Sequence, residues 1–262
     1  MLMLGAITSS PAVACDPPIF GEAGDDAGTI VLREPLDGSR DLRLAGIALP
    51  PGGGTGGDDP ADRAAGDAAR HLIADALQDR CIRLERDADA TDRYGRLLAQ
   101  VYIDDTDVWL QGALLAAGLA RVRPTPDERA RIADMLAIEI AAREAGAGMW
   151  RDRAFEVRPA SEPARIEGGF RIVEGRVLAA ERRGDVWYLN FGREWRSDFT
   201  VTIPKEVLPT FARAGIEPFA LQGRSIRVRG WVQPMNGPMI ELVVPEQIEV
   251  LDAARVPADG GR

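Results

Sequence analysis

Apolar residues recur at intervals of three and four over residues 61–78, and this spacing predicts an amphipathic helix. Residues 107–117 and 127–145 also follow a helical pattern, and the second stretch begins at Thr125-Pro126-Asp127-Glu128, a typical helix start. Short β-like runs alternate with these helices at residues 29–32, 42–47, 81–86 and 97–103. The first half of the chain is therefore expected to combine short strands with helices.

From Phe170 onwards the hydrophobic period changes to two, which is typical of half-buried strands. A short helix is expected at about 205–214, and Asn236-Gly237 predicts a hairpin turn. The predicted strands are 170–180, 185–191, 198–203, 225–233, 238–243 and 247–250. Three strands, a helix and further strands form the order of an OB-type barrel. We therefore expect an OB-like domain at 169–252, after a linker at 153–168 and before a tail at 253–262.

The composition excludes several classes of function. The 262 residues suggest two domains, and 41 acidic against 32 basic side chains give a net charge of -9. This balance argues against a protein that coats nucleic acid by charge alone, although it allows a local basic cleft. His71 is the only histidine and there are two cysteines, which largely excludes His-based triads, multi-His metal sites and zinc ribbons. Any catalysis is expected to use carboxylates, arginines and hydroxyls. No apolar run reaches the roughly 18 residues of a membrane span.

The N-terminal segment suggests export to the periplasm or the medium. Residues 1–14 are short and apolar and end in Ala12-Val13-Ala14, an A-x-A cleavage pattern, so they are interpreted as a possible signal peptide or else a frayed end. Cys15 would then be the first mature residue. It either carries a lipid, since the preceding residues resemble a bacterial lipobox, or pairs with Cys81. The alternative for Cys81 is a buried free thiol.

Two arginines are candidates for phosphate chemistry because of where they lie. Arg43 belongs to the strand Leu42-Arg43-Leu44-Ala45-Gly46-Ile47, and Arg96 ends the turn Asp92-Arg93-Tyr94-Gly95-Arg96. Cleavage of a phosphodiester builds negative charge on the phosphorane, and paired guanidinium groups can donate bidentate hydrogen bonds to it. Either arginine taken alone is more typical of an ordinary surface charge.

The features around these arginines come in a recognisable order. Arg43-Leu44-x-Gly46-Ile47 and a proline are followed by a helix and by Asp92-Arg93-Tyr94-Gly95-Arg96-Leu97-Leu98-Ala99. Val108-Trp109-Leu110-Gln111, Gly118-Leu119-Ala120-Arg121-Val122, a helix and a tryptophan complete the series. Over about residues 26–152 this series resembles the staphylococcal nuclease (thermonuclease) family. The resemblance implies a five-stranded OB-type barrel with packed helices, so the expected fold class is α+β, mainly β, with two OB-type barrels.

The resemblance also implies roles for single residues. In that family two arginines grip the scissile phosphate, and they correspond to Arg43 and Arg96, which would make these the catalytic residues of an active enzyme. Tyr94 would lie near the nucleotide and contact the substrate. Carboxylates of the family hold a calcium ion, and a glutamate assists the attacking water.

The carboxylates of the family do not match this sequence. The family's metal-binding aspartate is Ala48 here, its glutamate is Pro51, and an earlier aspartate is Gly28. General-base assistance is worth roughly 10²–10⁴-fold, and a metal ion adds charge stabilisation, so two arginines without either should bind phosphate but cleave it slowly. Asp58 and Asp59 are possible substitute acids, with Asp25 or Asp26 as further candidates.

The second half carries aromatic and basic side chains that suit a nucleic-acid surface. Aromatic residues in Trp187-Tyr188-Leu189-Asn190-Phe191 can stack on bases, and Arg227 and Arg229 alternate onto one face, where they would contact the substrate backbone. The alternative is that the aromatic side chains simply fill the barrel. This half resembles, more weakly, the OB-type domain that accompanies some bacterial nuclease-like domains.

Three functions remain open from these observations. The first is an exported thermonuclease-like protein that binds nucleic acid, a nucleotide or another phosphate ester through the arginine pair, with hydrolysis impaired or lost and no cofactor. The second is an active secreted nuclease that uses Ca²⁺ and substitute carboxylates. The third is a non-enzymatic envelope protein whose barrels bind a protein or a glycan.

Overall fold

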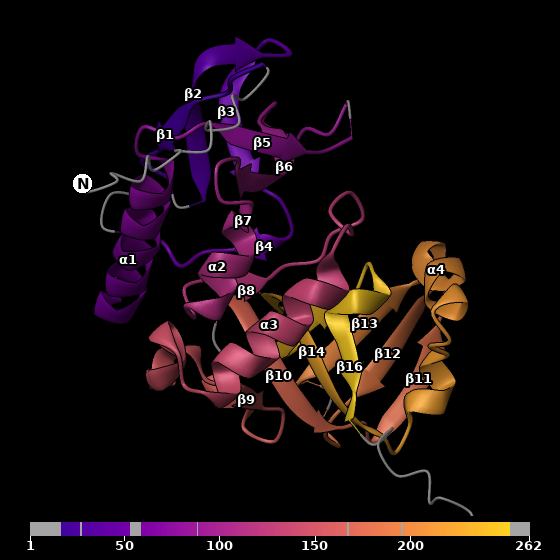
Figure 1. Ribbon diagram of the computed structural model, residues 1–262. Coiled ribbons are helices and arrows are strands. Elements are labelled where there is room, and N and C mark those ends of the chain that lie inside the picture. The colour runs from indigo at the N-terminus through magenta and orange to yellow at the C-terminus, as the bar shows by residue number, and fades with distance from the viewer. Residues whose placement is uncertain are drawn as a thin grey trace, which may run out of the picture. The chain divides into compact units, whose positions relative to one another are not determined.

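The computed structural model describes residues 17–26, 28–52, 59–87, 89–166, 168–194 and 196–251 (Figure 1). The chain forms two compact units, Met1–Ala45 with Leu49–Ala120, and Gly46–Ala48 with Arg121–Arg262. The division therefore falls after Ala120, whereas the domains expected from the sequence divide near residue 152. The reason is that helix α3 (Ile132–Glu144) packs within the second unit.

The first unit is a mixed sheet with two helices. Its strands are β1 (Gly21–Ala23), β2 (Thr29–Leu36), β3 (Ser39–Leu44), β5 (Ile82–Glu85), β6 (Leu97–Ile103) and β7 (Val108–Trp109). Their order is β1-β2-β3-β6-β5, with β7 also paired to β6. Only the β3–β6 pair is parallel among these described strands. This crossover places the strand of Arg43 beside the segment that follows Arg96.

The helices of the first unit follow from the sequence pattern. Helix α1 (Pro60–Leu77) begins at the cap Asp59, whose Oδ1 accepts a hydrogen bond from the Ala61 amide at 2.8 Å. Its buried residues lie along one stripe, as the predicted helix 61–78 requires, and they are Ala65, Gly66, Ala69, Ile73 and Leu77. The helix packs on β1, and α2 (Leu110–Ala116) packs on β6. The helices expected from the apolar spacing are therefore confirmed here.

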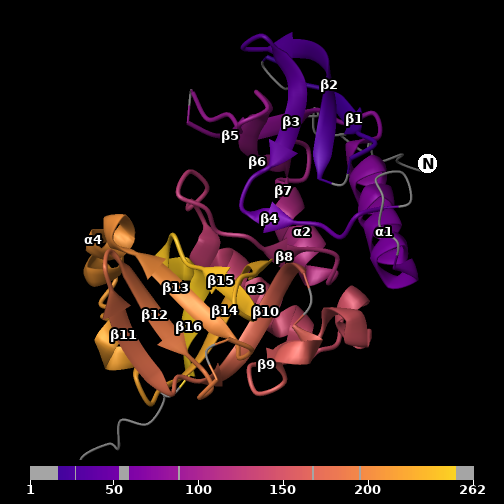
Figure 2. The ribbon, with the colours of Figure 1, turned by 180° about the vertical axis from the view of Figure 1, so that it is seen from behind.

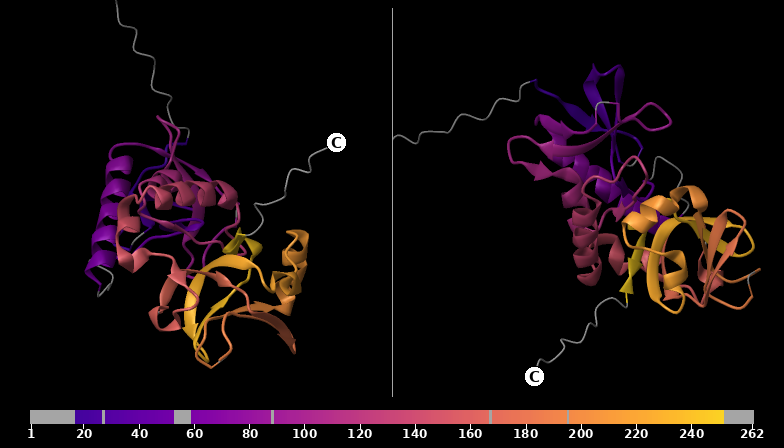
Figure 3. Two further views of the ribbon diagram at one scale, coloured as in Figure 1. Left: turned by 90° about the horizontal axis from the view of Figure 1, so that it is seen from below. Right: turned by 90° about the vertical axis from the view of Figure 1, so that its right-hand side faces the viewer.

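The second unit contains a strongly curved sheet, which Figures 2 and 3 show from behind, from below and from one side. Its strands are β9 (Arg158–Pro159), β10 (Gly169–Arg176), β11 (Ala179–Arg183), β12 (Val186–Asn190), β13 (Thr200–Pro204), β14 (Ser225–Pro234), β15 (Pro238–Glu241) and β16 (Ile248–Val250). Their order is β11-β12-β13-β15-β14-β10-β9, and β16 also pairs with β14.

This strand order is OB-like. Only two residues separate β10 from β11 in the chain, yet the two strands lie far apart in the order of the sheet. One nearly continuous segment therefore contributes strands to two distant parts of a curled sheet. Helix α4 (Leu208–Arg213) lies in the chain between β13 and β14, and the β13–β15 pair is parallel. The described residues form eight strands in this sheet, whereas six were predicted, because the run expected at 170–180 is interrupted between β10 and β11 and β9 is added.

Smaller elements complete the second unit. Strand β4 (Ile47–Ala48) pairs with β8 (Arg121–Val122). The stretch expected as a linker contains β9 and two short 3-10 helices, Arg153–Phe155 and Pro163–Arg165. The other 3-10 helices of the unit are Gly148–Arg151, Lys205–Val207, Pro218–Leu221 and Pro245–Gln247.

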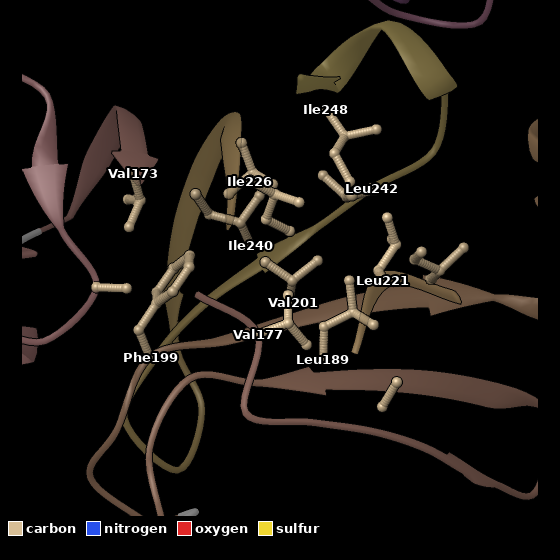
Figure 4. Packing of buried hydrophobic residues seen from close by; sticks show 14 of the residues in the cluster. Val173, Val177, Leu189, Phe199, Val201, Leu221, Ile226, Ile240, Leu242 and Ile248 are labelled. Atoms are coloured by element: carbon tan, nitrogen blue, oxygen red, sulfur yellow. The ribbon is translucent and has the colours of Figure 1, made fainter. Parts of the chain in front are cut away.

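Apolar side chains of alternate positions fill the curled sheet, as Figure 4 shows. Leu189 of β12 and Val201 of β13 are fully buried and point to this core, together with Ile226 of β14 and Ile240 of β15. Since side chains alternate along a strand, the neighbours of these residues lie on the opposite face of the sheet. That opposite face is polar over β12 and β13.

Helix α3 is joined to the curled sheet by a buried ion pair. Glu139 of α3 is 0 % exposed, and Arg229 of β14 is 1 % exposed. Arg229 Nη1 donates to Glu139 Oε1 at 2.8 Å and to Oε2 at 3.0 Å, while Oε2 also accepts from the Val122 amide at 2.6 Å. The helix thus depends on residues far outside the first half of the sequence.

We predict that residues 121–152 do not fold in a fragment that ends at residue 152. Such a fragment lacks Arg229, so the Glu139 carboxylate and the apolar face of α3 would have no place to be buried. Limited trypsin digestion should cut the fragment at Arg131, directly before α3, and at Arg143, within α3. The intact chain should resist cleavage at Arg143. Equal protection of both proteins would contradict this expectation.

Candidate functional site

Arg96 lies directly before β6 and is held by two carboxylates. Its Nε and Nη2 donate to Asp92 Oδ2 at 2.8 and 2.7 Å, and Nη1 donates to Asp26 Oδ2 at 3.0 Å. Burial by itself lowers the pKa of Arg96, but the hydrogen bonds and charges of Asp92 and Asp26 outweigh it, and the pKa is raised. The guanidinium group is therefore permanently charged and has a fixed orientation.

Asp92 also organises the turn that carries Arg96. Its Oδ1 accepts from the amides of Tyr94 and Arg96 at 2.9 and 3.1 Å, and Gly95 has a φ of +77°, in the left-handed region that favours glycine. Burial raises the pKa of Asp92, but the hydrogen bonds from Arg96 and from the two amides, with the charge of Arg96, bring it below its usual value. The pentapeptide 92–96 is thus a preorganised loop that presents one arginine.

Arg43 lies on β3, next to β6, and its side chain is on the same face of the sheet as Thr29, which Arg96 contacts. In β3 it is paired directly with Thr29 of β2 and with Leu98 of β6. Directly paired residues point to the same side of a sheet, so the side chains of Arg43 and Thr29 share a face. Arg96 Nη1 reaches Thr29 Oγ1 at 3.4 Å. The structure therefore brings the two predicted arginines to one side of β2, β3 and β6.

Tyr94 is 68 % exposed and lies between two guanidinium groups. The guanidinium carbons of Arg93 and Arg96 are 4.8 and 5.4 Å from the centre of its ring, and Arg93 Nη2 donates to the tyrosine hydroxyl at 2.7 Å. An exposed aromatic ring beside an arginine is suited to stacking on a base.

The residues present do not fit a calcium ion. Calcium takes six to eight oxygen ligands, many of them from carboxylates, whereas the resemblance assigns the three acidic positions to Gly28, Ala48 and Pro51, none of which has a side-chain oxygen. A Cβ atom on Gly28 would lie 3.2 Å from Leu49 Cδ1, and the φ of Gly28 is +86°. Within the described part of the chain no group of three or more histidine, cysteine or acidic side chains could hold a metal ion.

The two proposed substitute acids have different positions. Asp59 is exposed and caps α1, where its carboxylate accepts a hydrogen bond from the Ala61 amide. Asp58 lies outside the described residues. The acid that does reach an arginine is Asp26, which sequence reasoning ranked below both. No local sequence pattern signals this contact, because it depends on the pairing of β2 with the strand of Arg43.

The contact of Asp26 with Arg96 predicts competition with a bound anion. The Asp26 side chain is 57 % exposed, whereas that of Asp92 is only 10 % exposed, so an incoming phosphate can displace Asp26 far more easily. Because an exposed ion pair is worth ~0.2–1 kcal/mol, Asp26→Asn should tighten oligonucleotide binding by about two- to fivefold. Fluorescence anisotropy at low salt measures this. Asp25→Asn removes the same charge one residue away, and equal tightening by both variants would contradict a specific effect.

The assignment of Arg227 and Arg229 to substrate binding requires correction. Arg229 Nη2 donates to Glu249 Oε1 at 2.6 Å in addition to its bonds with Glu139, and its side chain has no access to solvent. Arg227 donates to Glu174 Oε2 at 2.7 Å and to Glu249 Oε2 at 3.0 Å. The two arginines do share a face, as the alternation predicted, but that face packs against acidic side chains. Neither presents a free guanidinium group to a ligand.

Comparison with known families supports the assignment of the first half. The family model described as Staphylococcal nuclease homologue matches residues 41–152. Residues 41–152 are therefore similar to staphylococcal nuclease. The match includes Arg43, Tyr94 and Arg96, and the family suggests nucleic-acid binding or phosphodiester hydrolysis. No curated protein matches the chain.

The cysteine state bears on where the protein works. Cys81 is disulfide-bonded and is not a free thiol. The other cysteine of the sequence is Cys15, which, like the possible signal peptide 1–14, lies outside the described residues. No helix of the described segments is long and apolar enough to cross a membrane.

Proposed function

We propose that the protein binds single-stranded nucleic acid or related phosphate esters through Arg43 and Arg96, with hydrolysis impaired or lost. The observation that carries this proposal is the fixed guanidinium group of Arg96, held by Asp92 at 2.7–2.8 Å beside the face of Arg43. Preorganised charge-assisted donors bind phosphate without losing side-chain freedom at the moment of binding.

Each residue of the site has a separate task in this proposal. The phosphate oxygens accept hydrogen bonds from Arg96 and Arg43 after Asp26 has moved aside. Thr29 offers a hydroxyl group on the same face, and the ring of Tyr94 stacks on the adjacent base. The net charge of -9 makes this a local interaction, so affinity is expected to fall steeply with salt concentration.

Weak hydrolysis follows from the identities of Gly28, Ala48 and Pro51. None of these side chains can ligate a cation or accept a proton from water, so the site binds the phosphodiester without a placed general base. Losing general-base assistance alone costs roughly 10²–10⁴-fold in rate.

One assay tests binding and hydrolysis together. Labelled single-stranded DNA is incubated with the protein in EDTA, in calcium and in magnesium, and anisotropy and strand length are followed. We expect salt-sensitive binding in EDTA that Arg43→Ala weakens, with no calcium-dependent cleavage. The matched control is Arg40→Ala, an exposed arginine of the same strand. Rapid cleavage in calcium would establish an active nuclease instead, and equal binding by both variants would refute the role of Arg43.

We also propose export, which the disulfide of Cys81 supports because such bonds persist in oxidising compartments. A sulfur atom in a disulfide cannot also carry a thioether lipid. The exported protein should therefore react with maleimide at no cysteine before reduction and at two after it. An intact mass that includes an acyl-glyceryl group at Cys15 would overturn this expectation.

A further inference from the structure

A second candidate binding site lies on the polar face of the curled sheet. A hollow of about 330 Å³ is formed by β12, β13 and the β14–β15 hairpin, with Tyr188, Thr202 and Met235 among its lining residues. This volume falls at the lower end of the range for small-molecule pockets. If β10 and β11 count as one strand, β12 and β13 are the second and third strands of the barrel (Figure 2). The second and third strands, with the loops beside them, form the usual ligand face of OB folds.

The strand register orders the polar groups of this face in two rows. Tyr188 is paired with Thr202, which is paired with Glu241. Asn190 is paired with Thr200 in the next row, which continues to Met239 and Gln233. An aromatic ring, two hydroxyl groups, two amides and a carboxylate therefore line one small hollow.

One buried polar group of this hollow is left without a partner by the fold. Thr202 is 3 % exposed, and its Oγ1 makes no hydrogen bond with any described residue. Tyr188 is half-buried, and Gln233 and Glu241 are exposed on the same face. A buried hydroxyl without a partner costs ~1–3 kcal/mol, which a ligand that hydrogen-bonds to it can recover.

The rim of the hollow includes a hairpin tip that packs against a neighbouring loop. Asn236 and Gly237 have φ values of +52° and +90° at the tip of the hairpin, as expected from the sequence. A Cβ atom on Gly237 would lie only 2.6 Å from the Asp198 carbonyl oxygen, so the tip packs directly against the loop before β13. A preformed rim reduces the entropy lost when a ligand binds.

The charged side chains around the hollow indicate which class of ligand it can bind. The only charged side chains that line the described hollow are Arg183 and Glu241, and Arg183 is paired with Glu181 at 2.9 Å. A polyanion requires an excess of lysine or arginine, which this face lacks. Neutral ligands with many hydroxyl groups match it, because tyrosine packs on the apolar face of a sugar ring while amides, hydroxyls and a carboxylate bind its hydroxyl groups.

We propose that this hollow, defined by Tyr188, Thr202, Gln233 and Glu241, is a binding site for neutral oligosaccharides. It is independent of the arginine site of the first unit. The second unit would then recognise a glycan while the first recognises a phosphate ester.

Calorimetric titration with chitotetraose, cellotetraose and maltotetraose, and with oligo-dT, tests the proposal. We expect at least one neutral tetrasaccharide to bind with little dependence on salt, and Tyr188→Ala to weaken it by about tenfold. Tyr94→Ala, which changes an exposed tyrosine of the other unit, is the matched control and should bind the sugar normally. If none of the three sugars binds, or if oligo-dT binding depends on Tyr188, the proposal is overturned.

Thr202→Val separates ligand recognition from folding. The substitution removes a hydroxyl group that the fold leaves unpartnered, so the thermal midpoint of the free protein should not fall. Tetrasaccharide binding should nevertheless weaken by about tenfold, because the ligand loses that partner. Unchanged sugar affinity in Thr202→Val would remove Thr202 from the site and would contradict the proposal.

Discussion

Arg229→Met should lower the free energy of unfolding by about 3–5 kcal/mol, the usual cost of removing one partner of a buried ion pair. Arg229 is 1 % exposed and donates to both Glu139 and Glu249 at 2.6–3.0 Å. Without it, Glu139 is a fully buried carboxylate whose remaining hydrogen bond comes from the Val122 amide. Helix α3 would lose its ion pair with β14, and β16 would keep only the pair between Arg227 and Glu249.

Urea unfolding followed by circular dichroism measures this loss. Arg227→Met is the matched control, since Arg227 lies two residues away on the same face but is 19 % exposed, so its loss should cost clearly less. Equal destabilisation by both variants would show that burial of Arg229 is not the cause. Glu139→Gln should also destabilise, because Arg229 would then lack its fully buried partner.

The pH dependence of the free energy of unfolding tests the same prediction in a second way. Burial raises the pKa of Glu249, but the charge and hydrogen bond of Arg229, with Arg227 and Arg143, bring it below its ordinary value. A lowered folded-state pKa adds stability above the unfolded-state pKa, and this stability is lost as the pH falls through the folded-state pKa. Arg229→Met removes the positive charge that lowers this pKa most. The difference in the free energy of unfolding between the unsubstituted protein and Arg229→Met should therefore become smaller as the pH falls into the acid range. A constant difference would contradict the assignment.

Arg96→Ala should weaken binding of single-stranded DNA by about 10–100-fold, the largest effect expected at the arginine site. Arg96 is the donor that Asp92 holds in place, and hydrogen bonds from a charged group are worth ~1.5–3 kcal/mol. The substitution also leaves Asp26 and Asp92 without their cation, so the site becomes negative and repels the phosphate.

Arg96→Lys distinguishes geometry from charge. Lysine keeps the positive charge but is a point donor without the planar fork that binds two oxygens, so it should recover only part of the affinity. The slope of log affinity against log salt should fall by about one in Arg96→Ala and remain unchanged in Arg96→Lys. The role of Arg96 would be contradicted if Arg96→Ala bound single-stranded DNA with full affinity while Arg43→Ala still weakened binding. The phosphate would then bind elsewhere along the strand of Arg43.

Local patterns predicted most of the elements. The helix at 61–78 is observed as Pro60–Leu77, and the strands at 97–103 and 225–233 are observed as Leu97–Ile103 and Ser225–Pro234. These elements bury one stripe or one face, so their period is visible in the sequence. The run expected as one strand at 42–47 is instead broken after Leu44, because Gly46 has a φ of +79°.

The site was only partly predictable. Arg43 and Arg96 could be chosen from their motifs, and the loss of acids at Gly28, Ala48 and Pro51 is visible in the sequence itself. The contact of Asp26 with Arg96 spans 70 positions and depends on strand pairing, so no local pattern contains it. The hollow at Tyr188 required the register of three strands.

The amino-acid sequence alone determined most of the segments that become helices or strands, because residue type and spacing carry these periods, while the predicted roles of the arginines and the missing acids came from the family resemblance of its motifs. Only the tertiary structure decided that Arg229 is buried on Glu139 while the guanidinium group of Arg96 stays accessible. Both arginines lie in or next to a strand, and alternation assigns each to a face. What covers that face is set by α3, 90 residues away from Arg229 in the chain, through contacts that local spacing cannot contain.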